Sequence, residues 1–294
     1  MKYSSLKKVS SENDQIIEIL ELKEPHFYPL WHFHPESEIM LLNKSIGTQY
    51  VGDAIENFRT GDVVLLGPNI PHVWRNSKEH FIEGANLVAE ATVIYFREER
   101  FGSDFLSLPE MSDINKLLTI AQRGVRFEGK TNFVLAEKIH AMTRKEGSNR
   151  VIGLLSLLSY MANQCNYRPI SSLSYVPRVD ESDFGRFNMV LAYLMNNFSK
   201  KIKLDEIAGV ANMTPTAFCK YFKSRTNKTF VRFLNEIRIG HACKLLMEKE
   251  KGPSEICYES GFNNLTNFHI QFKKIKNMTP LEYQNRLAGE ELVG

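Results

Sequence analysis

The chain of 294 residues is longer than one ordinary domain and suits two, and its hydrophobic content of 43% can supply a core for each. It contains no apolar stretch long enough to span a bilayer and no apolar signal core near its start, so we expect a cytoplasmic protein without a membrane partner. The four cysteines lie far apart and lack metal-ligand spacing, which argues against a disulfide framework or a zinc finger.

The formal net charge of +3 is unevenly distributed along the chain. Residues 183–288 hold 17 Lys and Arg against 9 Asp and Glu, whereas residues 1–182 hold 20 against 23. A basic third on a slightly acidic body is typical of a region that neutralises phosphates, and binding of this kind weakens with salt. A solvated basic surface without a partner is the alternative, and charge alone does not decide between the two.

Residues 1–110 form the first predicted domain, and within it residues 15–100 predict β-structure. Short apolar runs rich in branched and aromatic residues are separated by Gly, Asn, Asp and Pro, a pattern typical of a small sandwich or barrel. The predicted strands lie at residues 16–20, 38–42, 48–51, 63–66 and 91–96.

Residues 111–164 predict a helical segment, with helices at 112–123, 132–145 and 148–164. The third helix has an apolar stripe that is wider than packing on one sheet requires. The stripe predicts either complete burial or contact with a second chain, and both interpretations stay open. Residues 165–182 lose all periodicity and contain several Pro and Ser, so they predict a linker.

Residues 183–288 predict an all-helical domain in which one pattern occurs twice. In each copy a short helix meets a tight turn and then a second helix that ends in Phe-Lys, at 222–223 and again at 272–273. A second helix presented in this way, with basic residues beside it, can reach base edges in a major groove. A long helix from about 229 to 247 joins the copies and would hold them at a fixed separation.

The two candidate reading helices lie at about 215–226 and 264–276, with Thr214 and Asn264 as N-caps. Phenylalanines spaced four apart face inward on both helices, which leaves the remaining positions for DNA. The side chains expected at the DNA surface are Thr214, Thr216, Cys219, Lys220, Lys223, Asn264, Leu265, Thr266, His269, Ile270 and Lys273.

In this region, about 185–287, the chain resembles the AraC/XylS family of bacterial transcription regulators. The resemblance is most specific at 256–262, 272–274 and 278–283, and Arg238 matches the family's long linker helix. Asn227 and Asn277 stand where the family often has glycine, and Asn tolerates the left-handed conformation that a helix C-terminus requires.

The front of the chain resembles the two cupin motifs, at residues 31–38 and 61–76. The resemblance implies a multi-domain α+β protein, with a cupin-like β-barrel (a double-stranded β-helix) and helices before the all-α tandem helix-turn-helix domain. The second motif departs at Asn69, where glycine is expected, and at Gly67, where proline is expected. The motif residues that are retained are His32, His34, Glu38, Gly61, His72 and Asn76.

Three histidines and one glutamate form a candidate site. His32 and His34 lie two apart and share one face of a strand, Glu38 returns to that face, and His72 arrives from a neighbouring strand. Such donors suit a divalent transition metal. The alternative is a polar cluster that is hydrogen-bonded within a pocket for an organic ligand. Further pocket residues, which as a class are more often plain core, are Trp31, Tyr50, Trp74 and Tyr95.

The two resemblances together imply a sequence-specific transcription regulator that responds to a small-molecule effector. The expected partners are double-stranded DNA, the effector, RNA polymerase and a second copy of the chain through the helix at 148–164. A metal-dependent cupin enzyme with a helical tail is the alternative, but it does not explain two helix-turn-helix patterns. An architectural DNA-binding protein leaves the cupin motifs without a role. We therefore expect no catalytic residues.

Overall fold

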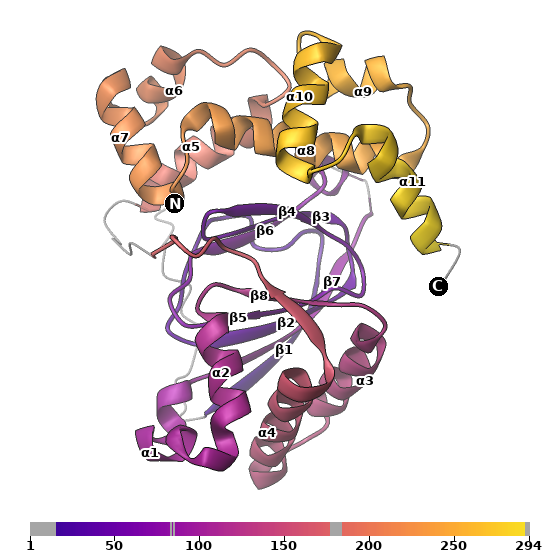
Figure 1. Cartoon of the computed structure of the whole chain (residues 1–294). Helices are drawn as coiled ribbons and strands as arrows, with labels where there is room; N and C mark the ends of the chain where they lie inside the picture. Colours follow the sequence, from indigo (N-terminus) through magenta and orange to yellow (C-terminus); the bar gives the residue numbers. More distant parts are fainter. Residues whose placement is uncertain (1–15, 83, 85, 177–183, 292–294) are drawn as a thin grey trace. The chain divides into compact units, whose positions relative to one another are not determined.

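The computed structural model describes residues 16–82, 84, 86–176 and 184–291 (Figure 1). The chain folds as two compact units, Met1–Phe184 and Gly185–Gly294. The first combines β-sheet with helices and the second is helical, so the fold is mixed, with a β-sheet domain before a helix-turn-helix domain. Across the described residues, no helix is both long and apolar enough to cross a membrane.

Two antiparallel sheets form among the described residues of the first unit, one in the order β1-β7-β2-β5-β8-β9 and a smaller one in the order β4-β3-β6. All five predicted strands are confirmed, whereas β4, β6, β8 and β9 were not predicted. The strands are β1 Ile17–Glu24, β2 Ser37–Lys44, β3 Gly47–Val51, β4 Ala54–Phe58, β5 Val63–Leu66, β6 His72–Asn76, β7 Ala89–Phe96, β8 Val125–Glu128 and β9 Asn166–Pro169.

The larger sheet is buried on both faces, because its strands alternate between two apolar layers. Met40, Val64 and Val93 belong to the layer shared with the small sheet, which also contains Trp74. The residues between them on the same strands, such as Ile39, pack with the helices on the other face. The core of this unit therefore lies in two layers, and the small sheet covers only one of them.

Helices close the outer face of the larger sheet (Figure 1). The three predicted helices are confirmed. The apolar stripe of the third is mostly buried within the chain, although Ile152 is 62% exposed. The helical elements are η1 Lys78–Phe81, η2 Glu98–Phe101, α1 Ser103–Ser107, η3 Pro109–Met111, α2 Ser112–Ala121, α3 Thr131–Thr143 and α4 Gly147–Gln164.

The predicted linker at 165–182 is wrong over its first part. Strand β9 pairs with β8, and Ser171 Oγ donates a hydrogen bond to the Val51 carbonyl over 2.9 Å. The Ser172 amide and hydroxyl both donate to the Asp53 carboxylate. Pro and Ser gave a loop signal here, but pairing with distant residues holds the segment in the first unit. Residues 177–182 of the predicted linker lie outside the described residues.

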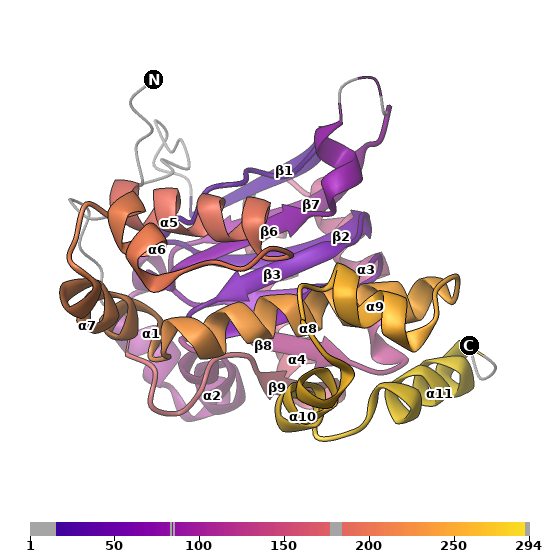
Figure 2. The ribbon, with the colours of Figure 1, turned by 90° about the horizontal axis from the view of Figure 1, so that it is seen from above.

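The second unit is arranged along α8. Figure 2 shows α6 and α7 at one end of α8 and α9 at the other. Its helices are α5 Phe184–Asn197, α6 Leu204–Val210, α7 Pro215–Thr226, α8 Phe230–Glu248, α9 Pro253–Glu259, α10 Leu265–Lys276 and α11 Pro280–Glu291. The reading helices predicted at 215–226 and 264–276 are thus α7 and α10.

Candidate DNA interface and buried histidine cluster

The turns of the two helix-turn-helix pairs, α6–α7 and α9–α10, have the same backbone design. Each contains one residue at positive φ, Asn212 at 53° and Gly261 at 85°. The next residue closes the turn in both, since the Met213 amide donates to the Ala208 carbonyl and the Phe262 amide donates to the Cys257 carbonyl. Asn therefore does in the first turn what Gly does in the second.

Both reading helices begin and end as predicted. Thr214 Oγ1 accepts a hydrogen bond from the Ala217 amide, and Asn264 Oδ1 accepts one from the Asn267 amide. Asn227 and Asn277 follow the helices at φ 54° and 58°. These left-handed residues stop each helix without glycine, so the departures from the family pattern preserve the fold.

The inner faces of the reading helices are filled by aromatic rings. Phe218 and Phe222 of α7 and Phe268 and Phe272 of α10 are all fully buried. The Phe222 ring also packs against α8, with its centroid 5.2 Å from that of Phe233. The opposite faces of α7 and α10 are consequently the ones that remain for a partner.

Most predicted DNA-contacting side chains lie on those outer faces. Leu265 is an exception, because it is half-buried and packs against the core around α8. Thr214 and Asn264 are exposed, although their oxygens accept the cap hydrogen bonds. Exposed Asn267 and Lys274 were not predicted. The remaining predicted residues, all exposed, are Thr216, Cys219, Lys220, Lys223, Thr266, His269, Ile270 and Lys273.

The structure brings His32, His34, His72 and Glu38 together within the first unit. Ligand nitrogens of the three buried histidines all lie within 4.8 Å of one another. Glu38 Oε2 is 3.0 Å from His34 Nε2 and 3.4 Å from His72 Nε2. Strand alternation alone does not bring these side chains together, because β2 begins only at Ser37. His32 instead pairs with His72 through two backbone hydrogen bonds.

The turn before His72 keeps its shape although Asn69 replaces glycine. Asn69 adopts φ 59°, the left-handed conformation that glycine would supply. Its amide donates to the His34 carbonyl over 2.8 Å, which ties this turn to the first motif. His72 consequently points toward the other histidines.

Main-chain carbonyls orient the imidazoles. The Nδ1 atoms of His32 and His72 lie 2.8 Å from the carbonyls of Leu30 and Ile70, and His34 Nδ1 lies 3.0 Å from that of Glu36. An N–H at Nδ1 donates to each carbonyl, which turns Nε2 toward the centre of the cluster. Carbonyl-bound imidazoles of this kind are typical of ligands whose orientation is fixed.

Burial and neighbouring charge set the ionisation of the cluster. Burial lowers the pKa of His32 well below its usual value, with His72 adding to the effect, and burial also lowers the pKa of His72. Burial acts to raise the pKa of Glu38, but the hydrogen bond from His34 and the proximity of His72 outweigh it and hold that pKa well below its usual range. The cluster thus places two imidazoles of lowered pKa, His32 and His72, beside a carboxylate.

Buried polar atoms without a hydrogen-bond partner among the described residues include His72 Nε2, which faces Glu38 Oε2 at 3.4 Å, Trp74 Nε1 and Gln49 Oε1. Trp74 is two residues after His72 on β6 and pairs with Gln49 on β3, so all three side chains share one face of the small sheet. Gln49 was not predicted, because a single Gln in a strand carries no local signal.

The predicted aromatic residues have different positions. The Trp74 ring centroid is 5.0 Å from that of His72, and the Tyr95 ring centroid is 5.2 Å from that of His34. Tyr50 is wrong as a pocket residue, because it neighbours Gln49 in β3 and strand alternation turns it to the opposite face. Trp31 is buried beside His32 in the chain, and its role stays a prediction.

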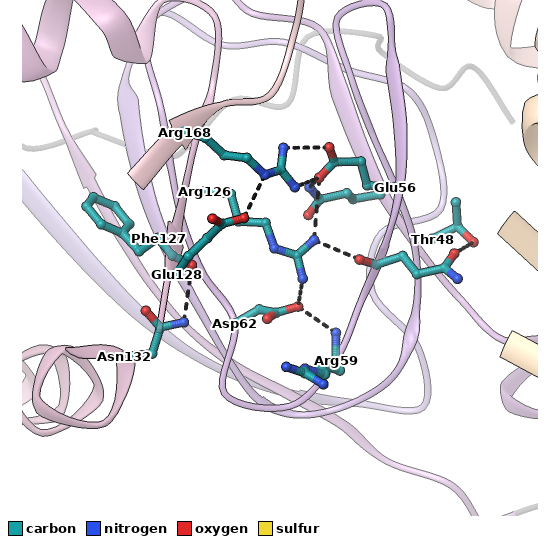
Figure 3. Close-up of polar contacts among 11 residues, drawn as sticks. Thr48, Glu56, Arg59, Asp62, Arg126, Phe127, Glu128, Asn132 and Arg168 are labelled. Atoms are coloured by element: carbon teal, nitrogen blue, oxygen red, sulfur yellow. Dashed lines mark hydrogen bonds and ion pairs between the residues drawn. The ribbon is translucent and has the colours of Figure 1, made fainter. Parts of the chain in front are cut away.

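A network of hydrogen bonds and ion pairs links the face of the small sheet that carries Gln49 to the end of the first unit (Figure 3). Gln49 Nε2 donates to Glu56, and Arg168 on β9 binds both oxygens of Glu56 over 2.7 and 2.9 Å. Arg126 on β8 bonds to Asp62 at 2.5 Å. The network therefore connects β3 and β4 of the small sheet to β9.

Comparisons with known proteins agree with the helical domain. Residues 207–286 match the family described as "Helix-turn-helix domain". The uncharacterized HTH-type transcriptional regulator YdeC of Bacillus subtilis (strain 168) is 22% identical over 88% of this chain and 86% of its own length. The HTH-type transcriptional activator RhaS of Escherichia coli O6:H1 is 23% identical over 88% of each. The structure of ToxT from Vibrio cholerae O395 is 14% identical, covers 93% of this chain and 99% of its own, and has a TM-score of 0.38.

The duplicated helix-turn-helix geometry and the relatives of similar length define a class, the DNA-binding transcriptional regulators. The chain's helix-turn-helix region, residues 207–286, is of the AraC/XylS type.

Proposed function

We propose that this regulator is sequence-specific and that both α7 and α10 enter the major groove of one duplex. The exposed outer faces and basic final turns of the two helices support this mode, with Lys223 and Lys273 at equivalent places. Recognition helices that read successive grooves on one face of DNA lie roughly 34 Å apart, one helical turn. The exposed side chains on the outer faces of α7 and α10 are the proposed contacts.

We further propose that the first unit is a cupin-like barrel that senses a small-molecule effector between its sheets. The observation that carries this proposal is the set of unpartnered atoms on Gln49, His72 and Trp74 in a buried setting. A buried polar atom without a partner costs about 1–3 kcal/mol, and a ligand that bonds to such atoms removes that cost. Glu38, His32, His34 and Tyr95 would line the same site.

A divalent transition metal fits the cluster through His32, His34, His72 and Glu38. Each imidazole directs Nε2 inward, and a metal would satisfy the unpartnered Nε2 of His72. When bound, a metal would supply Lewis acidity to an effector that coordinates it. Titration with Co²⁺ tests the fit, since we expect one ion per chain and its loss in His34→Ala, His72→Ala. A chain that binds no Co²⁺ would leave the cluster to an organic ligand.

Effector binding would act by favouring the DNA-competent or the incompetent state of the regulator, and only a difference in affinity between those states can do so. A homodimer through α4, where Ile152 is exposed, and contact with RNA polymerase in the cytoplasm complete the proposal. These steps link the first unit to transcription without assigning a direction to the response.

The test uses the full chain and an operator selected from a random duplex library. Reporter transcription from that operator is measured across a panel of carbon sources, and mobility shifts measure DNA affinity. We expect the double variant His34→Ala, His72→Ala to bind the operator. Its reporter transcription should no longer vary between carbon sources as it does with the unmodified chain. The matched control is His140→Ala, an exposed histidine on α3. A double variant that varies like the unmodified chain would place the sensor site elsewhere.

A further inference from the structure

Arg238 joins the two helix-turn-helix pairs directly. It lies on α8, and its Nε and Nη2 atoms donate to the carbonyls of Phe198 and Lys200, each over 2.8 Å. Those carbonyls belong to the segment between α5 and α6, just before the first pair begins. The guanidinium carbon also lies 5.7 Å from the centroid of the Phe262 ring, in the turn of the second pair.

The contact between the two pairs is close. A Cβ atom on Gly261 would lie 2.5 Å from the Phe198 carbonyl oxygen and 3.0 Å from Arg238 Nε. Phe198 also stacks edge-on against His241 of α8, with ring centroids 5.0 Å apart. The 198–200 segment, α8 and the 261–262 turn thus meet with no room for a further atom at Gly261.

The long helix alone does not fix how the pairs are oriented. The first pair packs on the start of α8, where Phe222 contacts Phe230 and Phe233, and the second packs on its later part around Ala242 and Leu246. A helix of this length, about 28 Å at 1.5 Å per residue, sets a separation along its axis. A second connection between the pairs is needed to resist their rotation about that axis, and Arg238 supplies it.

We propose that Arg238 is a positioning residue that fixes the relative orientation of α7 and α10 and thereby the operator spacing that the regulator accepts. The inference rests on the proposed mode in which both helices read one duplex. Arg238 touches no DNA in this account, and it acts through the turn that leads into α10. The planar guanidinium can bond two carbonyls at once, whereas the single ammonium of lysine cannot reproduce that fork.

The experiment compares full-length variants on the selected operator and on the same duplex with two base pairs inserted between its halves. The insertion rotates one half by about 70° relative to the other. We expect the unmodified chain to lose about tenfold in affinity, or about 1.4 kcal/mol, on the inserted duplex. Arg238→Gln should lose less than about threefold, with Arg238→Lys in between. Lys244→Gln, a charge removal farther along α8, should behave like the unmodified chain.

A direct structural readout accompanies the binding data. Spin labels on exposed Cys219 of α7 and on Asn267→Cys of α10, in a Cys165→Ser background, report the distance between the reading helices. We expect one narrow distribution in the parent and a broad one in Arg238→Gln. If circular dichroism shows that Arg238→Gln has lost helix, Arg238→Lys replaces it in both the binding and the distance measurements.

The outcomes separate the two proposals. A parent chain that binds both duplexes equally would contradict reading by two helices, and with it the proposed function. If the parent discriminates and the Arg238 variants discriminate equally, with an equally narrow distance distribution, the positioning role is wrong while the DNA-binding mode stands.

Discussion

The two helix-turn-helix pairs share a frame, meaning the backbone turns, caps and buried side chains that set their fold. They differ in the exposed side chains of their outer faces. Both have a positive-φ turn residue, an N-cap oxygen, two buried phenylalanines and a left-handed asparagine at the end. On the outer faces, Cys219 and Lys220 of α7 correspond to His269 and Ile270 of α10. The repeated residues therefore specify folding, whereas the residues that differ are free to specify which DNA each helix reads.

The largest expected effect tests the shared frame. Phe222→Ala and Phe272→Ala should each lower the free energy of unfolding by about 3–5 kcal/mol, because each removes a fully buried aromatic side chain and leaves a cavity. Urea denaturation followed by circular dichroism measures the loss. The control Lys220→Ala should change stability by less than about 0.5 kcal/mol. A Phe272→Ala variant as stable as the parent would show that the frame is not shared.

The next effect concerns the outer faces. Lys220→Ala should weaken DNA binding and reduce the slope of log affinity against log salt by about one, because one phosphate loses its counter-charge. Ile270→Ala should leave that slope unchanged and alter the preferred base at its contact, since an apolar side chain reads thymine methyl groups. Mobility shifts across a salt series measure both variants. Equal slopes for the two variants would contradict the assignment of a phosphate contact to Lys220 and a base contact to Ile270.

The smallest effect is at the caps. Thr214→Ala and Asn264→Ala should each cost about 1 kcal/mol of stability, and glycine at either position only a few tenths. The cap hydrogen bond is 2.8 Å at Asn264 and 3.4 Å at Thr214, so Asn264→Ala should cost more. Thermal unfolding measures the order, and a larger loss at Thr214 would contradict it.

Local signals made the helical unit predictable. Helical periodicity, cap residues and the four-residue phenylalanine spacing all act within one or two turns, so α7 and α10 were placed from sequence. The convergence of the histidines also followed from their spacing, although pairing between His32 and His72 was needed to complete it.

The features that could not be predicted depend on pairing between residues that are distant in the sequence. Arg168 and Glu56 are 112 residues apart, and neither carries a local sign of the other (Figure 3). Strand β9 has only four residues and ends in Pro169, so its sequence resembles a linker until β8 lies beside it. The register of β3 against β6 decides that Gln49, and not Tyr50, shares a face with His72. Local sequence does not give that register.

Hydroxyl-radical footprinting of the full-length chain on its selected operator shows whether α7 and α10 read the same duplex. We expect two protected stretches on one face of the DNA, centred about 10 base pairs apart. The stretch assigned to α10 should weaken in Ile270→Ala, and the stretch assigned to α7 should weaken in Lys220→Ala. A single protected stretch that both variants weaken equally would contradict reading of one duplex by both helices.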